Sequence, residues 1–167
     1  MSQITQNAPA SNKLAGKYLT FILQHESYGI EVLKVREIIR LTEITPVPQM
    51  PAYVSGVINL RGKIIPVMDL RVRFGFNNVQ NSEHTCIIVV QVKLPDGKSA
   101  QTGLIVDGVE EVLNLSEADI QETPDFGDTF SADFIFGMAK VKGTVKTLLD
   151  IDGVIGSGIL ESIRDAA

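Results

Sequence analysis

Two stretches decide the fold: residues 56–75, GVINLRGKIIPVMDLRVRFG, and residues 137–156, GMAKVKGTVKTLLDIDGVIG. Both read glycine, five residues, glycine, six residues, aspartate, five residues, glycine, and they begin 81 positions apart. In each stretch, two apolar runs flank a basic residue and a glycine, which is typical of a β-hairpin. Because coincident glycines indicate a shared backbone geometry, the pattern predicts two copies of one β-rich unit.

A second match lies earlier in each copy. Residues 29–39 (GIEVLKVREII) align with residues 103–113 (GLIVDGVEEVL) at an offset of 74. One glycine, two valines and one glutamate coincide, and three further positions stay aliphatic. The alternative explanation is that all β-hairpins resemble one another in sequence. That general similarity would not produce two separate matches in the same order along the chain. Internal duplication is therefore the better interpretation.

Apolar alternation and turn residues predict the remaining elements. Strands are expected at residues 17–23, 28–31, 54–60, 63–68, 86–93, 99–106, 109–113, 134–141 and 144–149. Helical turns are expected at residues 33–38, a short helix at 70–74, and a final helix that places Ile159, Leu160 and Ile163 on one face.

The fold class is mainly β. Each unit of roughly 70 residues, with about five strands, fits a small barrel. The predicted organisation is a flexible tail over residues 1–16, two intertwined barrel subdomains with approximate halves 17–80 and 84–156, and a helical tail over 157–167. Two small barrels are expected to pack together and share apolar surface.

Composition argues against several function classes. The net charge is −5 and no run of Lys or Arg offers a phosphate-binding face, so nucleic acid is not expected as a partner. No signal peptide is evident, and no apolar run approaches the roughly 20 residues of a membrane span. Cys86 is the single cysteine, so an intramolecular disulfide is excluded, which fits a reducing compartment. Its thiol is expected to be buried in the protein.

Catalytic machinery is not recognisable in the sequence. His25 and His84 lie in polar stretches without a Cys or a second His at ligand spacing. Residues 150–153 (DIDG) begin like a calcium loop but lack its third acidic position and closing glutamate. We therefore expect a protein without catalysis, metal or cofactor. A barrel that binds a small ligand remains an alternative.

The sequence resembles the CheW family of bacterial chemotaxis adaptors from about residue 17 to 155. The resemblance rests on residues 28–38 (YGIEVLKVREI), 56–62 (GVINLRG), 66–71 (PVMDLR) and 103–109 (GLIVDGV). It implies two SH3-like five-stranded barrels. It also implies a cytoplasmic adaptor that joins the tips of chemoreceptors to the regulatory domain of the histidine kinase CheA, in membrane-associated arrays where the chain could also self-associate.

Four residues match binding positions of that family: Arg61, Val35, Glu37 and Phe126. By resemblance, Arg61 couples receptor and kinase, Val35 and Glu37 belong to the binding surface, and Phe126 makes the kinase-facing ring contact. Without the resemblance, the residues have simpler interpretations. Arg61 is then a solvated turn arginine, Val35 is a core residue and Glu37 is an exposed carboxylate on a helix. Phe126 could equally anchor a loop.

Two features leave alternatives open. Residues 121–122 (Gln-Glu) stand where family members carry a basic residue nearby, so the charge at that contact is expected to differ. The chain could also be a CheW-like module of a larger kinase or of an adaptor fused to a receiver domain, although its polar start and helical end are expected of a complete chain.

Overall fold

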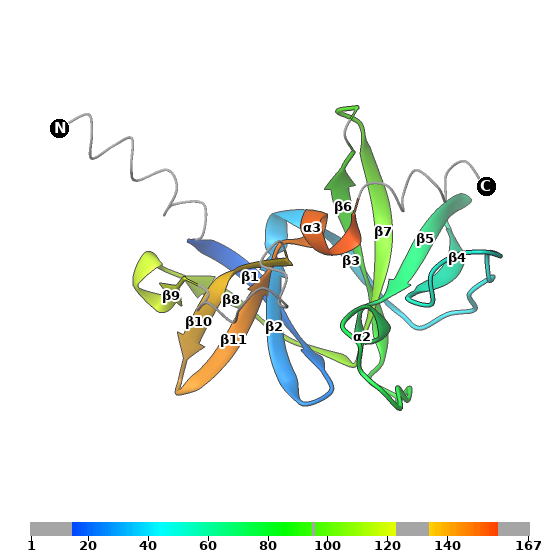
Figure 1. Cartoon of the computed structure of the whole chain (residues 1–167). Helices are drawn as coiled ribbons and strands as arrows, with labels where there is room; N and C mark the ends of the chain where they lie inside the picture. The colour runs from blue at the N-terminus through cyan, green and yellow to red at the C-terminus, as the bar shows by residue number, and fades with distance from the viewer. Residues whose placement is uncertain (1–14, 95, 123–133, 157–167) are drawn as a thin grey trace.

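The computed structural model describes residues 15–94, 96–122 and 134–156 (Figure 1). The strands are β1 (Gly16–Leu23), β2 (Glu26–Glu31), β3 (Val35–Arg40), β4 (Val54–Leu60), β5 (Lys63–Asp69), β6 (Cys86–Lys93), β7 (Ser99–Val106), β8 (Gly108–Leu115), β9 (Ile120–Gln121), β10 (Ile135–Val141) and β11 (Thr144–Leu149). The helices are η1 (Val32–Lys34), α2 (Leu70–Arg73), η2 (Glu117–Asp119) and α3 (Ile151–Ile155).

The strands form two sheets, visible side by side in Figure 1. The six-stranded sheet has the order β8-β1-β2-β11-β10-β9, and the five-stranded sheet has the order β3-β6-β7-β5-β4. When each strand is replaced by its counterpart in the other copy, the order β8-β1-β2-β11-β10 becomes β3-β6-β7-β5-β4, which is the complete order of the five-stranded sheet. Each sheet therefore takes two strands from one copy and three from the other, and β9 is the additional strand.

A close approach of backbones recurs in both copies and requires glycine. Gly56 has a φ of +140°, and a Cβ added there would lie 2.1 Å from the carbonyl oxygen of Thr45. At the duplicated position, a Cβ on Gly137 would lie 2.7 Å from the carbonyl oxygen of Gln121. In both hairpins the register shifts at this glycine. The shared glycine spacing thus reflects a shared bulge and contact.

The described residues form three apolar cores, and one of them lies between the two sheets. Phe21, Ile88, Leu104 and Leu149 belong to a common core between the sheets. The five-stranded sheet packs a second core of its own, which includes Ile87, and the six-stranded sheet packs a third. Successive residues of β6 thus enter different cores, which explains why this strand is apolar without alternation.

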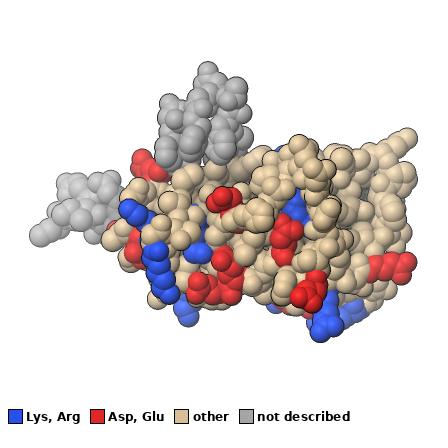
Figure 2. Space-filling model, turned by 90° about the horizontal axis from the view of Figure 1, so that it is seen from below, with Lys and Arg blue, Asp and Glu red and all other residues tan. Residues whose placement is uncertain are grey.

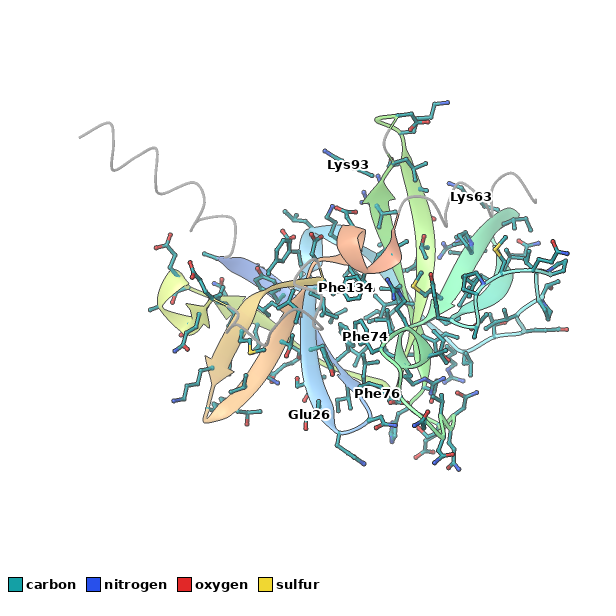
Figure 3. All side chains as sticks on the ribbon, in the orientation of Figure 1. Glu26, Lys63, Phe74, Phe76, Lys93 and Phe134 are labelled. Atoms are coloured by element: carbon teal, nitrogen blue, oxygen red, sulfur yellow. The ribbon has the colours of Figure 1, made fainter. Side chains whose placement is uncertain are left out.

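A row of aromatic rings crosses the boundary between the sheets. The centroid of Phe74 lies 5.9 Å from that of Tyr28 and 6.3 Å from that of Phe134, and Figure 3 places Phe74 and Phe134 near this boundary. The guanidinium carbon of Arg73 lies 4.8 Å from the ring centroid of Tyr53 and 4.5 Å from that of Phe134. Tyr53 and Phe134 are duplicated positions, so both copies contribute to this contact.

All nine predicted strands and the helix at residues 70–74 are confirmed, with ends that differ by at most two residues. The helical turns predicted at residues 33–38 are confirmed only at residues 33–34, in η1. From Val35 the prediction is wrong, because the chain continues as strand β3, paired with β6. Val35, Ile38 and Ile39 are β-branched, and alternate residues of β3 are exposed. Helix α3 was not predicted, and the helix expected at Ile159–Ile163 lies outside the described residues.

Two further expectations concern Cys86 and membranes. Cys86 is half-buried against the common core, and burial raises the pKa of its thiol. Among the helices that the structure describes, none is long and apolar enough to cross a membrane.

Candidate protein-binding surface

The turn between β4 and β5 presents Arg61 at the tip of a tight hairpin. Arg61 and Gly62 both have positive φ values, 54° and 84°, as a two-residue turn with the right-handed twist of its strands requires. The Asn59 side-chain oxygen accepts a hydrogen bond from the Gly62 N–H at 2.8 Å, which fixes the turn. The Arg61 side chain is 73% exposed.

Arg61 and Glu37 form a two-pronged ion pair. The two terminal nitrogens of Arg61 donate to the two carboxylate oxygens of Glu37 at 2.6 and 2.8 Å. The hydrogen bond from Arg61 lowers the pKa of Glu37, and the same bond raises the pKa of Arg61. The guanidinium is therefore held in one plane while most of it faces solvent.

Val35 lies on the same strand as Glu37 but is used differently. Val35 pairs with Val90 and Glu37 with Val89, so the register shifts between them and Arg36 is the extra residue. Val35 is half-buried and packs against the common core between the sheets. The structure thus brings Arg61 and Glu37 together and places Val35 in apolar packing.

The fourth predicted residue, Phe126, lies outside the described residues. The nearest described residues are Gln121, which ends strand β9, and Glu122, and both are exposed.

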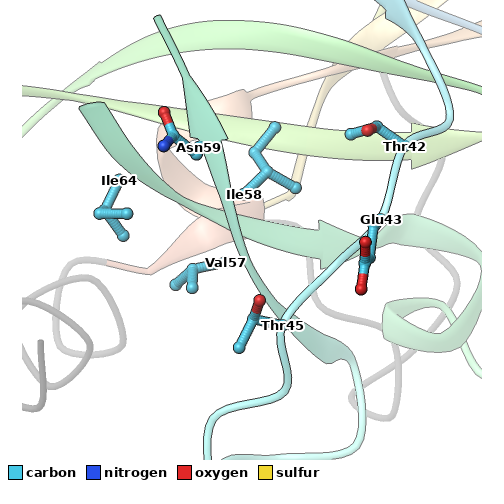
Figure 4. A pocket seen from close by; sticks show the side chains of 7 residues that line it. All are labelled: Thr42, Glu43, Thr45, Val57, Ile58, Asn59 and Ile64. Carbon is cyan, nitrogen blue, oxygen red and sulfur yellow. The ribbon is translucent and has the colours of Figure 1, made fainter. Parts of the chain in front are cut away.

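A surface hollow of about 370 Å³ adjoins the Arg61 hairpin (Figure 4). Asn59 and Ile64 are opposite each other in the pairing of β4 with β5, and both line it. The other lining residues are Thr42, Glu43, Thr45, Val57 and Ile58. The hollow offers hydroxyl groups, one amide and one carboxylate beside aliphatic side chains.

Exposed aliphatic residues are the feature that sequence reasoning missed. Ile38 is 45% exposed and Val112 is 55% exposed, while Ile64 is 53% and Val145 is 52% exposed. Ile38 and Val112 are duplicated positions at the offset of 74, and Ile64 and Val145 at the offset of 81. Outward-facing strand positions are usually polar, so apolar side chains at matching places in both copies suggest contact surface. Aligning the copies position by position could have revealed the pairs.

Leu33 is the most exposed large apolar residue of the described chain, at 87%. It belongs to η1, where the chain passes from β2 to β3.

Charge on the surface is mixed. Figure 2 shows acidic and basic side chains interspersed over one face, with no continuous basic stripe among the described residues there. In the part of the chain that the structure describes, no three His, Cys, Asp or Glu residues are grouped to hold a metal ion. The described surface combines charges of both signs with scattered exposed aliphatic residues.

Comparison with known proteins gives a consistent picture. The family model of the CheW-like domain matches residues 17–158. The chemotaxis protein CheW of Klebsiella aerogenes is 36% identical over 161 residues, covering 93% of this chain and 94% of that protein. The chemotaxis protein CheW of Rhizobium meliloti is 37% identical over 139 residues, covering 83% and 86%.

A solved structure agrees with these relatives. The scaffolding protein TtCheW of Thermoanaerobacter tengcongensis superposes with a TM-score of 0.71 at 36% identity, covering 82% of this chain and 90% of that one. Since the family model and these relatives span most of the chain and most of their own length, the chain belongs to the family of CheW-like domain proteins.

Proposed function

We propose that this chain is a chemotaxis adaptor that couples the cytoplasmic tips of chemoreceptors to the regulatory domain of the histidine kinase CheA. The observation that supports it most is the match to the CheW-like domain over residues 17–158, together with relatives of matching length named as chemotaxis proteins. The adaptor works without catalysis or cofactor, in the cytoplasm, and joins receptor arrays through its partners.

The geometry of Arg61 suits this role. A guanidinium has five N–H donors, and Glu37 accepts from the two terminal nitrogens. Because the side chain is 73% exposed, its remaining donors can reach a carboxylate on a partner without breaking the internal pair. Glu37 acts by orienting Arg61, which reduces the rotamer entropy lost on binding.

Aliphatic residues supply the apolar part of the contact. An amphipathic receptor helix buries its apolar face against a groove or patch of a partner. Ile38 and Ile64 on the five-stranded sheet, with Val112 and Val145 on the six-stranded sheet, are the exposed side chains that could be covered in this way. Equivalent exposed residues on both sheets would let one adaptor contact two partners at once.

The remaining assignments stay proposals on the resemblance. Val35 would support the binding surface from beneath, because its packing against the common core fixes the start of β3. Phe126 would contact the kinase side of a ring. Self-association in arrays would use the same faces, and individually weak contacts would become stable through multivalency.

A solution titration against the isolated CheA regulatory domain at micromolar concentrations tests the proposal. We expect saturable one-to-one binding. Arg61→Ala should weaken binding to kinase or receptor about tenfold, equivalent to about 1.4 kcal/mol. Lys142→Ala is the matched control, since Lys142 occupies the duplicated turn position with a φ of 51° and is also exposed. The absence of binding by a folded chain would refute the adaptor role.

A further inference from the structure

The chain passes between the two sheets at two duplicated places. It leaves the six-stranded sheet after β2 and enters the five-stranded sheet at β3, through η1. It returns at Asp107, between β7 and β8. Each crossover is bound to the short helix that follows the last strand of a copy, α2 or α3.

The return crossover, between β7 and β8, is held by Asp107. One carboxylate oxygen accepts from a terminal nitrogen of Arg71, on α2, at 2.9 Å. The other accepts from the Gln24 N–H, in the turn between β1 and β2, at 2.6 Å. Asp107 therefore joins a helix of the five-stranded side to a turn of the six-stranded sheet.

The earlier crossover, through η1, is held by the same kind of contact with the charges exchanged. Lys34, at the end of η1, donates to one carboxylate oxygen of Asp152, on α3, at 2.9 Å. The other oxygen of Asp152 accepts from the Lys93 N–H, at the end of β6, at 3.4 Å. Asp152 is the duplicated position of Arg71, so the helix carries the cation at one crossover and the carboxylate at the other.

The two contacts differ in burial. The Arg71 side chain is 3% exposed, and it also bonds Asp69 through two nitrogens at 2.9 and 3.0 Å. Lys34 and Asp152 are 26% and 39% exposed. A buried, multiply bonded ion pair is strongly destabilised when one partner is lost, whereas a partly exposed pair exchanges readily with water.

We propose that Lys34–Asp152 is a releasable contact that adjusts the relative orientation of the two sheets, while Arg71–Asp107 is the fixed one. If the proposed adaptor function holds, this pair is a positioning element. Partners that contact different sheets are held in a relative orientation that depends on the Lys34–Asp152 pair. A change in that orientation alters how one partner shifts the conformational equilibrium of the other.

The test measures the distance between the sheets in the isolated chain. Spin labels are placed at Lys63→Cys and Thr144→Cys, exposed and duplicated positions in the two hairpins, in a Cys86→Ala background. Lys34→Asp should shift or broaden the distance distribution measured by double electron–electron resonance. Lys98→Asp, the same charge change in an exposed turn of one sheet, should leave the distribution unchanged.

The exchanged pair Lys34→Asp/Asp152→Lys provides the rescue. It should restore at least half of the change, because Arg71–Asp107 already shows that a helix cation and a crossover carboxylate fit this geometry. An unchanged distribution in Lys34→Asp, or a change that the exchanged pair does not reverse, would overturn the proposal.

A second readout separates this proposal from the adaptor function. Lys34→Asp should still bind the kinase domain and receptor membranes within about threefold, while receptor control of kinase activity falls and recovers in the exchanged pair. Wild-type chain that binds neither partner would refute the adaptor function and leave the distance result standing. Full receptor control in a variant with shifted distances would overturn the link to signalling.

Discussion

Arg61 and Glu37 tie the tip of the β4–β5 hairpin to strand β3 through two hydrogen bonds of 2.6 and 2.8 Å. Strands β3 and β4 are the two edges of the five-stranded sheet and are not neighbours in its order. The ion pair therefore connects opposite edges of the sheet at an exposed site, where partners can reach the guanidinium.

Arg61→Glu should leave the fold intact and weaken receptor coupling. The new carboxylate would face Glu37 and repel a partner carboxylate, while the turn is exposed and retains its Asn59 hydrogen bond. Co-sedimentation with receptor-bearing membranes checks the coupling, circular dichroism checks the fold, and Lys142→Glu is the matched control. Wild-type co-sedimentation of Arg61→Glu would contradict the assignment of Arg61.

Gly56→Ala should destabilise the protein far more than Gly62→Ala. At Gly56 the added Cβ meets the Thr45 carbonyl oxygen at 2.1 Å, whereas nothing lies within 4 Å of a Cβ at Gly62. We expect a loss of at least about 3 kcal/mol at Gly56 and about 1–2 kcal/mol at Gly62, where only the left-handed backbone is penalised. Urea unfolding measures both, and equal losses would refute the close backbone contact.

Arg71→Met should cost about 3–5 kcal/mol of unfolding free energy, because it leaves Asp69 and Asp107 without their cation. Burial lowers the pKa of Arg71, but its hydrogen bonds to both carboxylates outweigh burial and raise the pKa. Lys34→Met removes the more exposed pair and should cost about 1 kcal/mol or less. Chemical denaturation compares the two variants, and similar losses would remove the distinction between the fixed and releasable contacts.

Lys146→Ile should leave stability unchanged within about 1 kcal/mol or increase it, because new apolar burial offsets the loss of a pair whose carboxylate is partly exposed. Lys146 is 6% exposed and donates to Ser27 at 2.8 Å and Glu110 at 3.3 Å. Its duplicated position holds Ile65, a core residue. The Glu110 side chain is 29% exposed, so water can solvate its carboxylate after the lysine is lost. Thermal unfolding tests this, with Lys146→Ala expected to lie about 2 kcal/mol below Lys146→Ile. A large loss in Lys146→Ile would mean that the ion pair is required.

Stability should fall as pH rises from about 10 towards 12, in part through Tyr18. Burial, followed by the charge of Glu31, raises the pKa of Tyr18 from 10.0 to about 12. The folded state therefore keeps the phenolic proton after the unfolded state has lost it, so stability present below pH 10 is lost through this range. Tyr18→Phe should flatten the decline in urea midpoints measured over this range; an unchanged slope would argue against the raised pKa.

Local sequence pattern was sufficient for the hairpins and the duplication. Residues 61–62 and 142–143 predict tight turns because each combines a glycine with flanking apolar runs. Which sheet receives each strand was beyond this pattern. The parallel pairings of β2 with β11 and β5 with β7 join residues far apart in sequence, and nothing local specifies them.

The site was predictable only in part. Arg61 was correctly expected at an exposed turn, but its partner Glu37 was placed on a helix. The six residues of β3, three of them β-branched, fit a helical or an extended pattern, and the pairing with β6 decides for the strand. The exchange of charge between Arg71–Asp107 and Lys34–Asp152 was also hidden, because Arg71 aligns with Asp152, of opposite charge, while Asp107 and Lys34 align with the uncharged Leu33 and Gly108.

Sedimentation of three components tests the adaptor function most directly. Receptor-bearing membranes and CheA are mixed with increasing amounts of the chain, and the kinase in the pellet is measured. We predict that the pelleted kinase rises with added chain, saturates, and falls when Arg61→Glu replaces the wild type. Kinase that stays in the supernatant at every concentration of a folded chain would contradict the account.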